Sequence, residues 1–219
     1  MFFKIKVTIW NGDMEMTWTE TNIHLFRAVN DLGKEHLFLN PIMIFIAEYL
    51  VWVLALTVLV FWITRNSNSR MMVICAGLTF ILAEVLGKIA GTIHSNEQPF
   101  ASLTNVNQLI EKAVDNSFPS DHTILFFSFC ITFWLFTRGW GFLWGLLALV
   151  VGVSRIWVGV HYPADVLVGA LISVVSAFVI YLVVPNLSIT KKCIIQYERA
   201  EHAIIAFILK KNEAKSKDF

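Results

Sequence analysis

The chain has 219 residues, of which 57% are hydrophobic and only 15% are charged, and it contains 18 Phe and 8 Trp. Soluble domains of this length rarely have such a composition, which indicates an integral membrane protein. The formal net charge of +1 comes without a basic block in a polar context, so nucleic acid is excluded as an expected partner.

The N-terminal residues and the cysteines carry no recognisable chemistry. Residues 1–18 form a charged extension to which we assign no function. They lack the apolar core of a signal peptide, so we expect membrane insertion through internal segments. Cys75, Cys130 and Cys193 lie in or beside apolar runs without the spacing of a metal site or a redox pair. We therefore expect neither disulfides nor thiol chemistry.

Two amphipathic patterns flank the apolar part of the chain. Between Glu20 and Leu39 one broad side of a helix is apolar, and it comprises Ile23, Leu25, Phe26, Val29 and Leu32. This pattern predicts a helix that lies in the membrane interface. A similar pattern over residues 188–210 predicts a second helix, which we place along the inner leaflet.

Five apolar segments follow one another between these patterns. They span approximately residues 41–63, 71–93, 123–137, 140–160 and 163–185. A membrane-crossing helix needs about 20 residues, so the sequence predicts an all-α polytopic bundle of about five transmembrane helices. We expect a membrane domain over residues 19–187, followed by a cytoplasmic amphipathic helix and basic tail over residues 188–219.

Loop charges predict the orientation of the bundle, because Lys and Arg favour the cytoplasmic side. By crossing parity most basic residues fall on one side: Arg65, Arg70, Arg138, Lys191, Lys192, Arg199, Lys210, Lys211, Lys215 and Lys217. The loop over residues 94–121 falls on the other side and contains Lys112 as its one Lys or Arg. We therefore expect the tail inside a bacterial plasma membrane and this loop outside.

The same parity brings several polar residues together at the outer face. They are Lys88, Ser120, Asp121, His122, Arg155, His161 and Asp165. His161 and Asp165 are four residues apart, a spacing that places two side chains on one helix face. A carboxylate there can hold one imidazole nitrogen and leave the other free to attack.

The remaining residues of this set suit an anionic substrate. His122 lies at a helix start, where free N–H groups and the helix dipole favour an anion. Ser120 adds a hydroxyl, and Arg155 adds a planar fork of donors that matches phosphate oxygens. One histidine as nucleophile and a second as general acid predict a phosphatase that requires neither a metal nor another cofactor.

Two motifs carry a family resemblance. Pro119-Ser120-x-His122 and Ser154-Arg155-x5-His161-x3-Asp165 resemble the type 2 phosphatidic acid phosphatase superfamily. Pro119-Ser120-Asp121-His122 resembles its bacitracin-resistance undecaprenyl-diphosphatase branch. The resemblance covers about residues 20–185 and implies hydrolysis of an isoprenoid lipid diphosphate at the outer face, which recycles a cell-wall carrier lipid and lowers bacitracin sensitivity. It also implies that His161 is the nucleophile, Asp165 its orienter, His122 the acid, and Ser120 and Arg155 the phosphate ligands.

The sequence departs from this family at two places. The first family motif is Lys-x6-Arg-Pro, but here Gln98 precedes Pro99, and Gly91 stands where the lysine is expected. We expect Lys88 or His94 to compensate, and we place Lys88 and Gln98 in the phosphate-binding set. Asp121 stands where most of the superfamily has Gly. We include Asp121 in the phosphate-binding set and expect its carboxylate to accept a hydrogen bond from a backbone donor or a lysine.

Other interpretations stay open. Ser120 and Asp121 are also common helix caps, and Lys88 can extend to lipid head groups. Glu48 and Glu84 lie within apolar segments, where we favour a structural or cavity role. A phosphatidate or phosphatidylglycerophosphate phosphatase and a non-catalytic lipid transporter are the alternative functions, and the complete histidine set favours an enzyme. The pattern does not indicate an oligomeric state.

Overall fold

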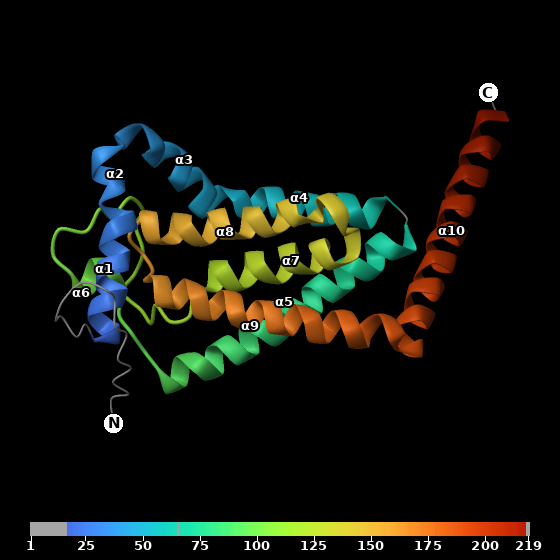
Figure 1. Cartoon of the computed structure of the whole chain (residues 1–219). Coiled ribbons are helices and arrows are strands. Elements are labelled where there is room, and N and C mark those ends of the chain that lie inside the picture. Colours follow the sequence, from blue (N-terminus) through green and yellow to red (C-terminus); the bar gives the residue numbers. More distant parts are fainter. Residues whose placement is uncertain (1–16, 65, 218–219) are drawn as a thin grey trace.

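The described part of the chain folds into a bundle of long helices, with shorter helices and loops gathered at one end (Figure 1). The computed structural model describes residues 17–64 and 66–217. The extension expected over residues 1–18 therefore lies almost wholly outside the described residues, as does Arg65. Within the described ranges the regular structure is helical, apart from one isolated bridge between Glu97 and Asn116.

Five apolar stretches form the long helices, which confirms the expected all-α membrane bundle. They are α3 (Asn40–Ile44) with a π-helical turn η2 (Phe45–Tyr49) and α4 (Leu50–Ile63), then α5 (Ser67–Ile93), α7 (Asp121–Thr137), α8 (Phe142–Trp157) and α9 (Pro163–Val183). The π-helical turn was not expected from the sequence. Helix α8 ends at Trp157 rather than near Val160, because Gly159 adopts a left-handed backbone conformation with φ 87°.

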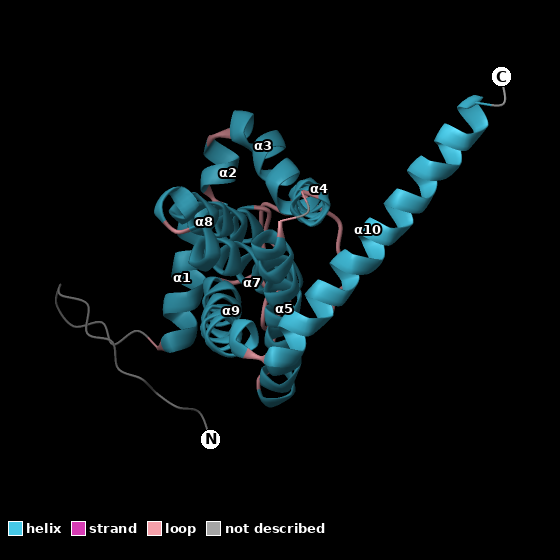
Figure 2. Cartoon of the chain, turned by 90° about the vertical axis from the view of Figure 1, so that its right-hand side faces the viewer, coloured by secondary structure: helices cyan, strands magenta, loops and turns pink. Residues whose placement is uncertain are grey.

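Four helical stretches in the described ranges are long and apolar enough to cross a membrane. They are Leu37–Ile63, Ser67–Ile93, Gly139–Trp157 and Pro163–Asn186, of which the last two include the short turns η3 (Gly139–Gly141) and η4 (Val184–Asn186). The fifth helix, α7, has 17 residues, fewer than the about 20 that the hydrocarbon core requires. It lies in the middle of the bundle against α5, α8 and α9 (Figure 2). Its surroundings are therefore mainly protein.

The core of the bundle is built around the aromatic side chains of α7. Phe126 and Phe133 are almost completely buried and pack with small residues of the neighbouring helices, such as Ala76 and Ala148. The outer faces of α4 and α9 instead expose many large apolar side chains, among them Leu56, Leu59, Leu171, Val175 and Leu182. Exposed apolar surface on this scale indicates contact with lipid.

A helix at the N-terminal side closes one end of the bundle. Helix α1 (Trp18–Asn30) begins with a capping box between Thr17 and Glu20, and α2 (Leu32–Glu35) and η1 (Leu37–Leu39) continue the chain. In Figure 1, α1 runs across the helix ends, as expected for an interfacial helix. Phe26 of the expected apolar side is fully buried, whereas Leu25 and Leu32 are exposed.

Helix α10 (Ser188–Lys217) crosses the opposite end of the bundle (Figures 1 and 2). Its attachment depends on Arg70 of α5, which is 1% exposed. The Arg70 guanidinium contacts Glu201 at 2.6 Å and Glu198 at 3.5 Å, and it lies 5.0 Å from the ring centroid of Tyr197. Ion pairs and a cation–π contact therefore join α10 to the bundle.

We expect Arg70→Met to loosen α10, because the two carboxylates lose their buried cation. A hydrogen bond to a charged group contributes about 1.5–3 kcal/mol, so the melting temperature in detergent should fall by several degrees, and protease should cut α10 faster. Arg199→Met, which removes an exposed arginine of the same helix, is the matched control. Equal cleavage rates for both variants would contradict this role of Arg70.

Candidate active site

The predicted catalytic residues meet at the end of the bundle that α1 covers. Ser120 precedes α7, and its N–H donates to the carbonyl of Asp165 in the first turn of α9 at 3.2 Å. Gly169 allows this approach, because a Cβ there would lie 3.2 Å from the Ser120 carbonyl oxygen. The two sequence motifs are thus joined through their backbones.

The loop over residues 94–120, which includes the short helix α6 (Pro99–Ser102), is fastened over this end of the bundle. Asn30 of α1 donates to the carbonyls of Asn107 at 3.0 Å and Trp157 at 2.8 Å, and accepts from the N–H of Asn107 at 2.9 Å. The guanidinium of Arg27 donates to the carbonyl of Asn105 at 2.9 Å. The interfacial helix therefore holds both this loop and the end of α8.

His161 is 2% exposed and is oriented by a backbone carbonyl. Its Nδ1 lies 2.9 Å from the carbonyl oxygen of Ser117. A carbonyl only accepts hydrogen bonds, so Nδ1 carries the proton and Nε2 presents its lone pair. The arrangement leaves the Nε2 lone pair available, as the predicted role of His161 as a nucleophile requires.

Lys112 is a site residue that the sequence analysis counted only as a loop charge. Its Nζ lies 3.4 Å from Nε2 of His161. Burial and then the positive charges of Lys112 and Arg155 hold the pKa of His161 well below its ordinary value. The imidazole is therefore neutral at neutral pH, as a nucleophile must be.

Asp165 places a carboxylate near His161 but does not form the hydrogen bond to its imidazole. Its Oδ2 lies 3.6 Å from Nδ1 of His161 and accepts the N–H of Tyr162 at 2.8 Å. The expected role as hydrogen-bond partner of the imidazole is thus filled by Ser117 in this structure. The carboxylate remains close enough to favour positive charge on the ring.

Two predicted phosphate ligands each have one buried donor atom without a partner. Ser120 Oγ and Arg155 Nε have no hydrogen-bond partner among the described residues, although Ser120 is 0% and Arg155 2% exposed. Ser120 occupies the N-cap position of α7 but makes no side-chain cap bond, which weakens its interpretation as a simple cap. Arg155 Nη1 donates to the carbonyl of Ala47 in the π-helical turn at 2.8 Å. Unsatisfied buried donors are costly, which is typical of a site that receives an anion.

A cavity of about 350 Å³ opens at this end of the bundle, and the buried Ser120, His161 and Asp165 are not among its lining residues. Lys112, His122 and Arg155 line it together with residues of the first long helix and of the loop, namely Glu48, Tyr49, Trp52, Ile110 and Glu111. The cavity thus contains the predicted general acid, one predicted phosphate ligand and Lys112, and Glu48 takes the cavity position expected for it. No group of three His, Cys, Asp or Glu side chains suited to a metal ion occurs in the described ranges.

Three predicted phosphate-binding residues are placed differently. Lys88 is 76% exposed and lies 3.7 Å from Glu84, away from the cavity lining. Gln98 is fully buried, and its side chain accepts from the N–H of Asp115 at 2.9 Å and thereby braces the loop. Asp121 is exposed at the start of α7. The structure does not bring these residues into the cavity, and their roles as phosphate ligands stay predictions.

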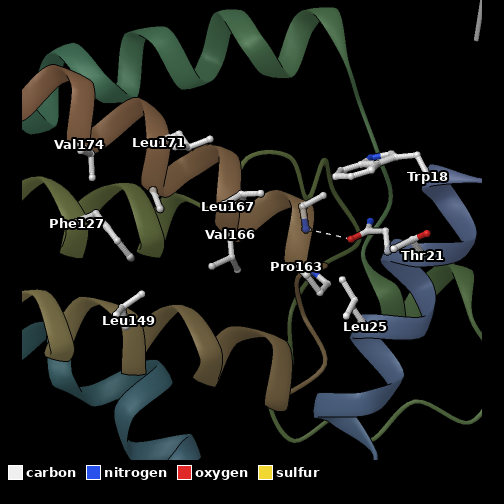
Figure 3. A pocket seen from close by; sticks show the side chains of 13 residues that line it. Trp18, Thr21, Leu25, Phe127, Leu149, Pro163, Val166, Leu167, Leu171 and Val174 are labelled. Atoms are coloured by element: carbon white, nitrogen blue, oxygen red, sulfur yellow. Dashed lines mark hydrogen bonds between the residues drawn. The ribbon is translucent and has the colours of Figure 1, made fainter. Parts of the chain in front are cut away.

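A separate groove of about 520 Å³ lies between α1, α8 and α9 (Figure 3). Its lining is apolar and includes Leu25, Leu149, Val166, Leu167 and Leu171. It shares no lining residue with the cavity that Lys112, His122 and Arg155 line. We therefore assign the polar chemistry to the smaller cavity.

Comparison with known proteins identifies the family. Residues 72–189 match the family model described as the PAP2 superfamily. The chain belongs to the PAP2 superfamily. This confirms the resemblance carried by the motifs around His122 and His161, and both motifs lie within the matched residues of this PAP2 protein.

Individual relatives of this PAP2 protein agree with the assignment. It is 52% identical to the "bacitracin transport permease protein BcrC" of Bacillus licheniformis, over 93% of this chain and 100% of the relative. It is 36% identical to "undecaprenyl-diphosphatase BcrC" of Bacillus subtilis strain 168, over 73% and 82% respectively. The crystal structure of Aquifex aeolicus LpxE matches with a TM-score of 0.58 and 26% identity, over 74% of this chain and 94% of that chain.

Asp165→Asn should lower kcat without unfolding the protein. The amide oxygen can still accept from Tyr162, and Ser117 still fixes the tautomer, but the negative charge beside the ring is lost. We expect kcat to fall by about 10²-fold, a loss typical of one group that acts in the transition state. Phosphate release and the melting temperature of the purified variant test this. A lower melting temperature with unchanged kcat would make Asp165 purely structural.

Proposed function

We propose that this PAP2 protein is a membrane phosphatase that converts undecaprenyl diphosphate into undecaprenyl phosphate and inorganic phosphate. The observation that carries the proposal is the tautomer of His161, which leaves the Nε2 lone pair free at the end of the bundle where Ser120 and Arg155 keep unpartnered donors. A nucleophile with a lone pair and fixed donors for developing negative charge are what phosphoryl transfer requires. The release of undecaprenyl phosphate would return the carrier lipid to cell-wall synthesis and lower bacitracin sensitivity.

The geometry supports a two-step mechanism. In the first step Nε2 of His161 attacks the terminal phosphorus, the bridging P–O bond breaks, and His122 protonates the departing oxygen of undecaprenyl phosphate. In the second step His122 removes a proton from water, the water oxygen attacks the phosphohistidine, and the P–N bond breaks. Asp165 stabilises the positive charge that the ring carries between the steps, while Ser120 and Arg155 hold the phosphoryl oxygens.

The surroundings of the cavity favour a substrate that is carried on a lipid. Tyr49 and Trp52 line the cavity and are 53% and 72% exposed on the first membrane-spanning stretch. Aromatic side chains at such positions suit the boundary between a polar head group and an apolar chain. A diphosphate in the cavity can therefore keep its isoprenoid chain among the lipids.

Transport of a lipid is the second candidate, because the 52% identical relative carries the name of a transport permease. Hydrolysis is favoured by the presence of His122, Arg155, His161 and Asp165 together at one end of the bundle. A transporter has no need of a tautomer-fixed imidazole beside unpartnered donors. A phosphatidate or phosphatidylglycerophosphate phosphatase would use the same chemistry, and competition between substrates on one preparation separates these activities.

We further propose that the active site faces the outside of a bacterial plasma membrane. The distribution of Lys and Arg supports this orientation, since α10 and its basic tail lie at the opposite end of the bundle (Figure 1). In this arrangement residues 19–187 form the phosphatase domain, and residues 188–219 form a cytoplasmic helix and tail. Residues 1–18 have no assigned role.

Phosphate release from undecaprenyl diphosphate in detergent, with excess chelator, tests the proposed chemistry. The wild-type protein should release phosphate, and His161→Ala should abolish release because the proposed nucleophile is removed. His24→Ala, which removes an exposed histidine of α1, is the matched control and should retain full activity.

Two results would contradict the proposal. Substantial release by folded His161→Ala would exclude the phosphohistidine route. Absence of release by the folded wild-type protein, on phosphatidate as well as on undecaprenyl diphosphate, would favour transport instead.

A further inference from the structure

We infer that Lys112 is a further phosphate ligand, whose ammonium binds the non-bridging oxygens of the phosphoryl group that His161 attacks. This inference rests on the proposed function and adds a residue outside the two sequence motifs. Lys112 belongs to the loop before α7 and lies between the catalytic histidine and the cavity.

The position of the ammonium carries the inference. Lys112 Nζ lies 3.4 Å from Nε2 of His161 and lines the cavity that His122 and Arg155 also line. A phosphorus poised for attack lies about 3–3.5 Å from the attacking atom. Its oxygens would then come within hydrogen-bond reach of Nζ. A cation placed there acts on charge that develops during transfer.

The charge of Lys112 is not used elsewhere in the described part of the chain. No carboxylate of the described residues forms an ion pair with it within 4.0 Å. Burial and then the charge of Arg155 lower the pKa of Lys112, and the more distant carboxylates of Asp121, Asp115 and Asp165 offset this only in part. A bound phosphate would relieve this repulsion.

Lys112 also supplies the charge that position 98 lacks. Gln98 is neutral, and its amide is used within the loop by Asp115. Lys88, the other candidate, pairs with Glu84 and is exposed. Lys112 is therefore the lysine that the structure places beside the nucleophile.

The loop holds Lys112 in a fixed place. Ile110, two residues earlier, is 8% exposed and packs with Ala47, Val158 and Val160. The N–H of Leu109 donates to the carbonyl of Val158 at 3.1 Å, and Gly159 lets the loop approach, because a Cβ there would lie 2.8 Å from the carbonyl oxygen of Asn107. Such anchoring keeps a ligand oriented before substrate arrives.

The free protein and the substrate complex differ in the partner of Lys112. Without substrate the ammonium donates to the lone pair of Nε2 and covers the nucleophile. When phosphate binds, this hydrogen bond passes to a phosphate oxygen, the proton remains on the lysine, and Nε2 becomes free to attack. Charge-assisted hydrogen bonds to phosphate are stronger than those to a neutral imidazole, which drives the exchange.

Kinetics of Lys112 variants on undecaprenyl diphosphate test the inference. Lys112→Met should lower kcat/KM by about 10²-fold, whereas Lys112→Arg should retain most of it because the cation is kept. Lys192→Met, which removes an exposed lysine of α10, should match the wild type. A loss in Lys88→Met with none in Lys112→Met would assign the cation to Lys88 and overturn the inference.

The pH profile separates a role in binding from a structural one. The charged and titratable groups around His161 come from four elements: Lys112, Asp121, His122, Arg155 and Asp165. Lys112 lowers the pKa of His161, so its removal should raise that pKa. The acidic limb of kcat/KM should then move to higher pH in Lys112→Met and stay in place in Lys112→Arg. A merely loosened loop would lower activity without this shift.

Calorimetric titration with inorganic phosphate gives a readout that does not depend on turnover. Phosphate should bind the wild-type protein and bind Lys112→Met at least tenfold more weakly; Lys112→Gln serves as the neutral variant if the Met variant is unstable. If the wild-type protein releases no phosphate from the lipid, but inorganic phosphate still binds Lys112→Met more weakly than the wild type, the proposed function fails and the inference holds. Equal phosphate affinity and equal kcat/KM in wild type and Lys112→Met would overturn it.

Discussion

The hydrogen bond between Nδ1 of His161 and the carbonyl of Ser117 is the interaction on which the site depends. It joins the loop before α7 to the turn between α8 and α9, and it determines which ring nitrogen keeps its lone pair. With the other tautomer, Nε2 would carry a proton and could not attack. The N–H of Ser117 is itself fixed by the carbonyl of Asn96 at 2.7 Å, so the orientation of the imidazole depends on the whole loop.

The site contains a buried positive charge, the guanidinium of Arg155, among apolar side chains, where burial of a charge is unfavourable. Arg155 is 2% exposed near the end of an apolar helix, with one donor on Ala47 and another without a protein partner. Burying a cation with incomplete hydrogen bonding is costly, and the cost is offset by the packed core around α7. The carbonyl of Ala47 belongs to a π-helical turn, a feature that often occurs at functional sites. A bound phosphate would accept the hydrogen bond for which Arg155 Nε has no protein partner.

Elements far from the chemistry set its geometry. The interfacial helix α1 contributes no group to the cavity lining, yet its Asn30 and Arg27 hold the loop that carries Lys112 and Ser117. Gln98 acts in the same way from within the loop. Gln98, at the position of the arginine in the first family motif, thus supports the site by bracing the loop over residues 94–120. At the other end, Arg70 attaches α10 without touching the site, so the two ends perform separate tasks.

The sequence by itself determined the membrane bundle and the residues of its two motifs. Long apolar runs between polar turns have few alternatives to transmembrane helices, and crossing parity was sufficient to bring His122, Arg155, His161 and Asp165 to one end. Only the tertiary structure decided that Ser117 rather than Asp165 bonds the imidazole, that Lys112 rather than Lys88 lies beside it, and that Gln98 braces a loop. These contacts depend on the path of the irregular loop over residues 94–120. No periodicity encodes that path, because it is set by individual hydrogen bonds to helices that are distant in the sequence.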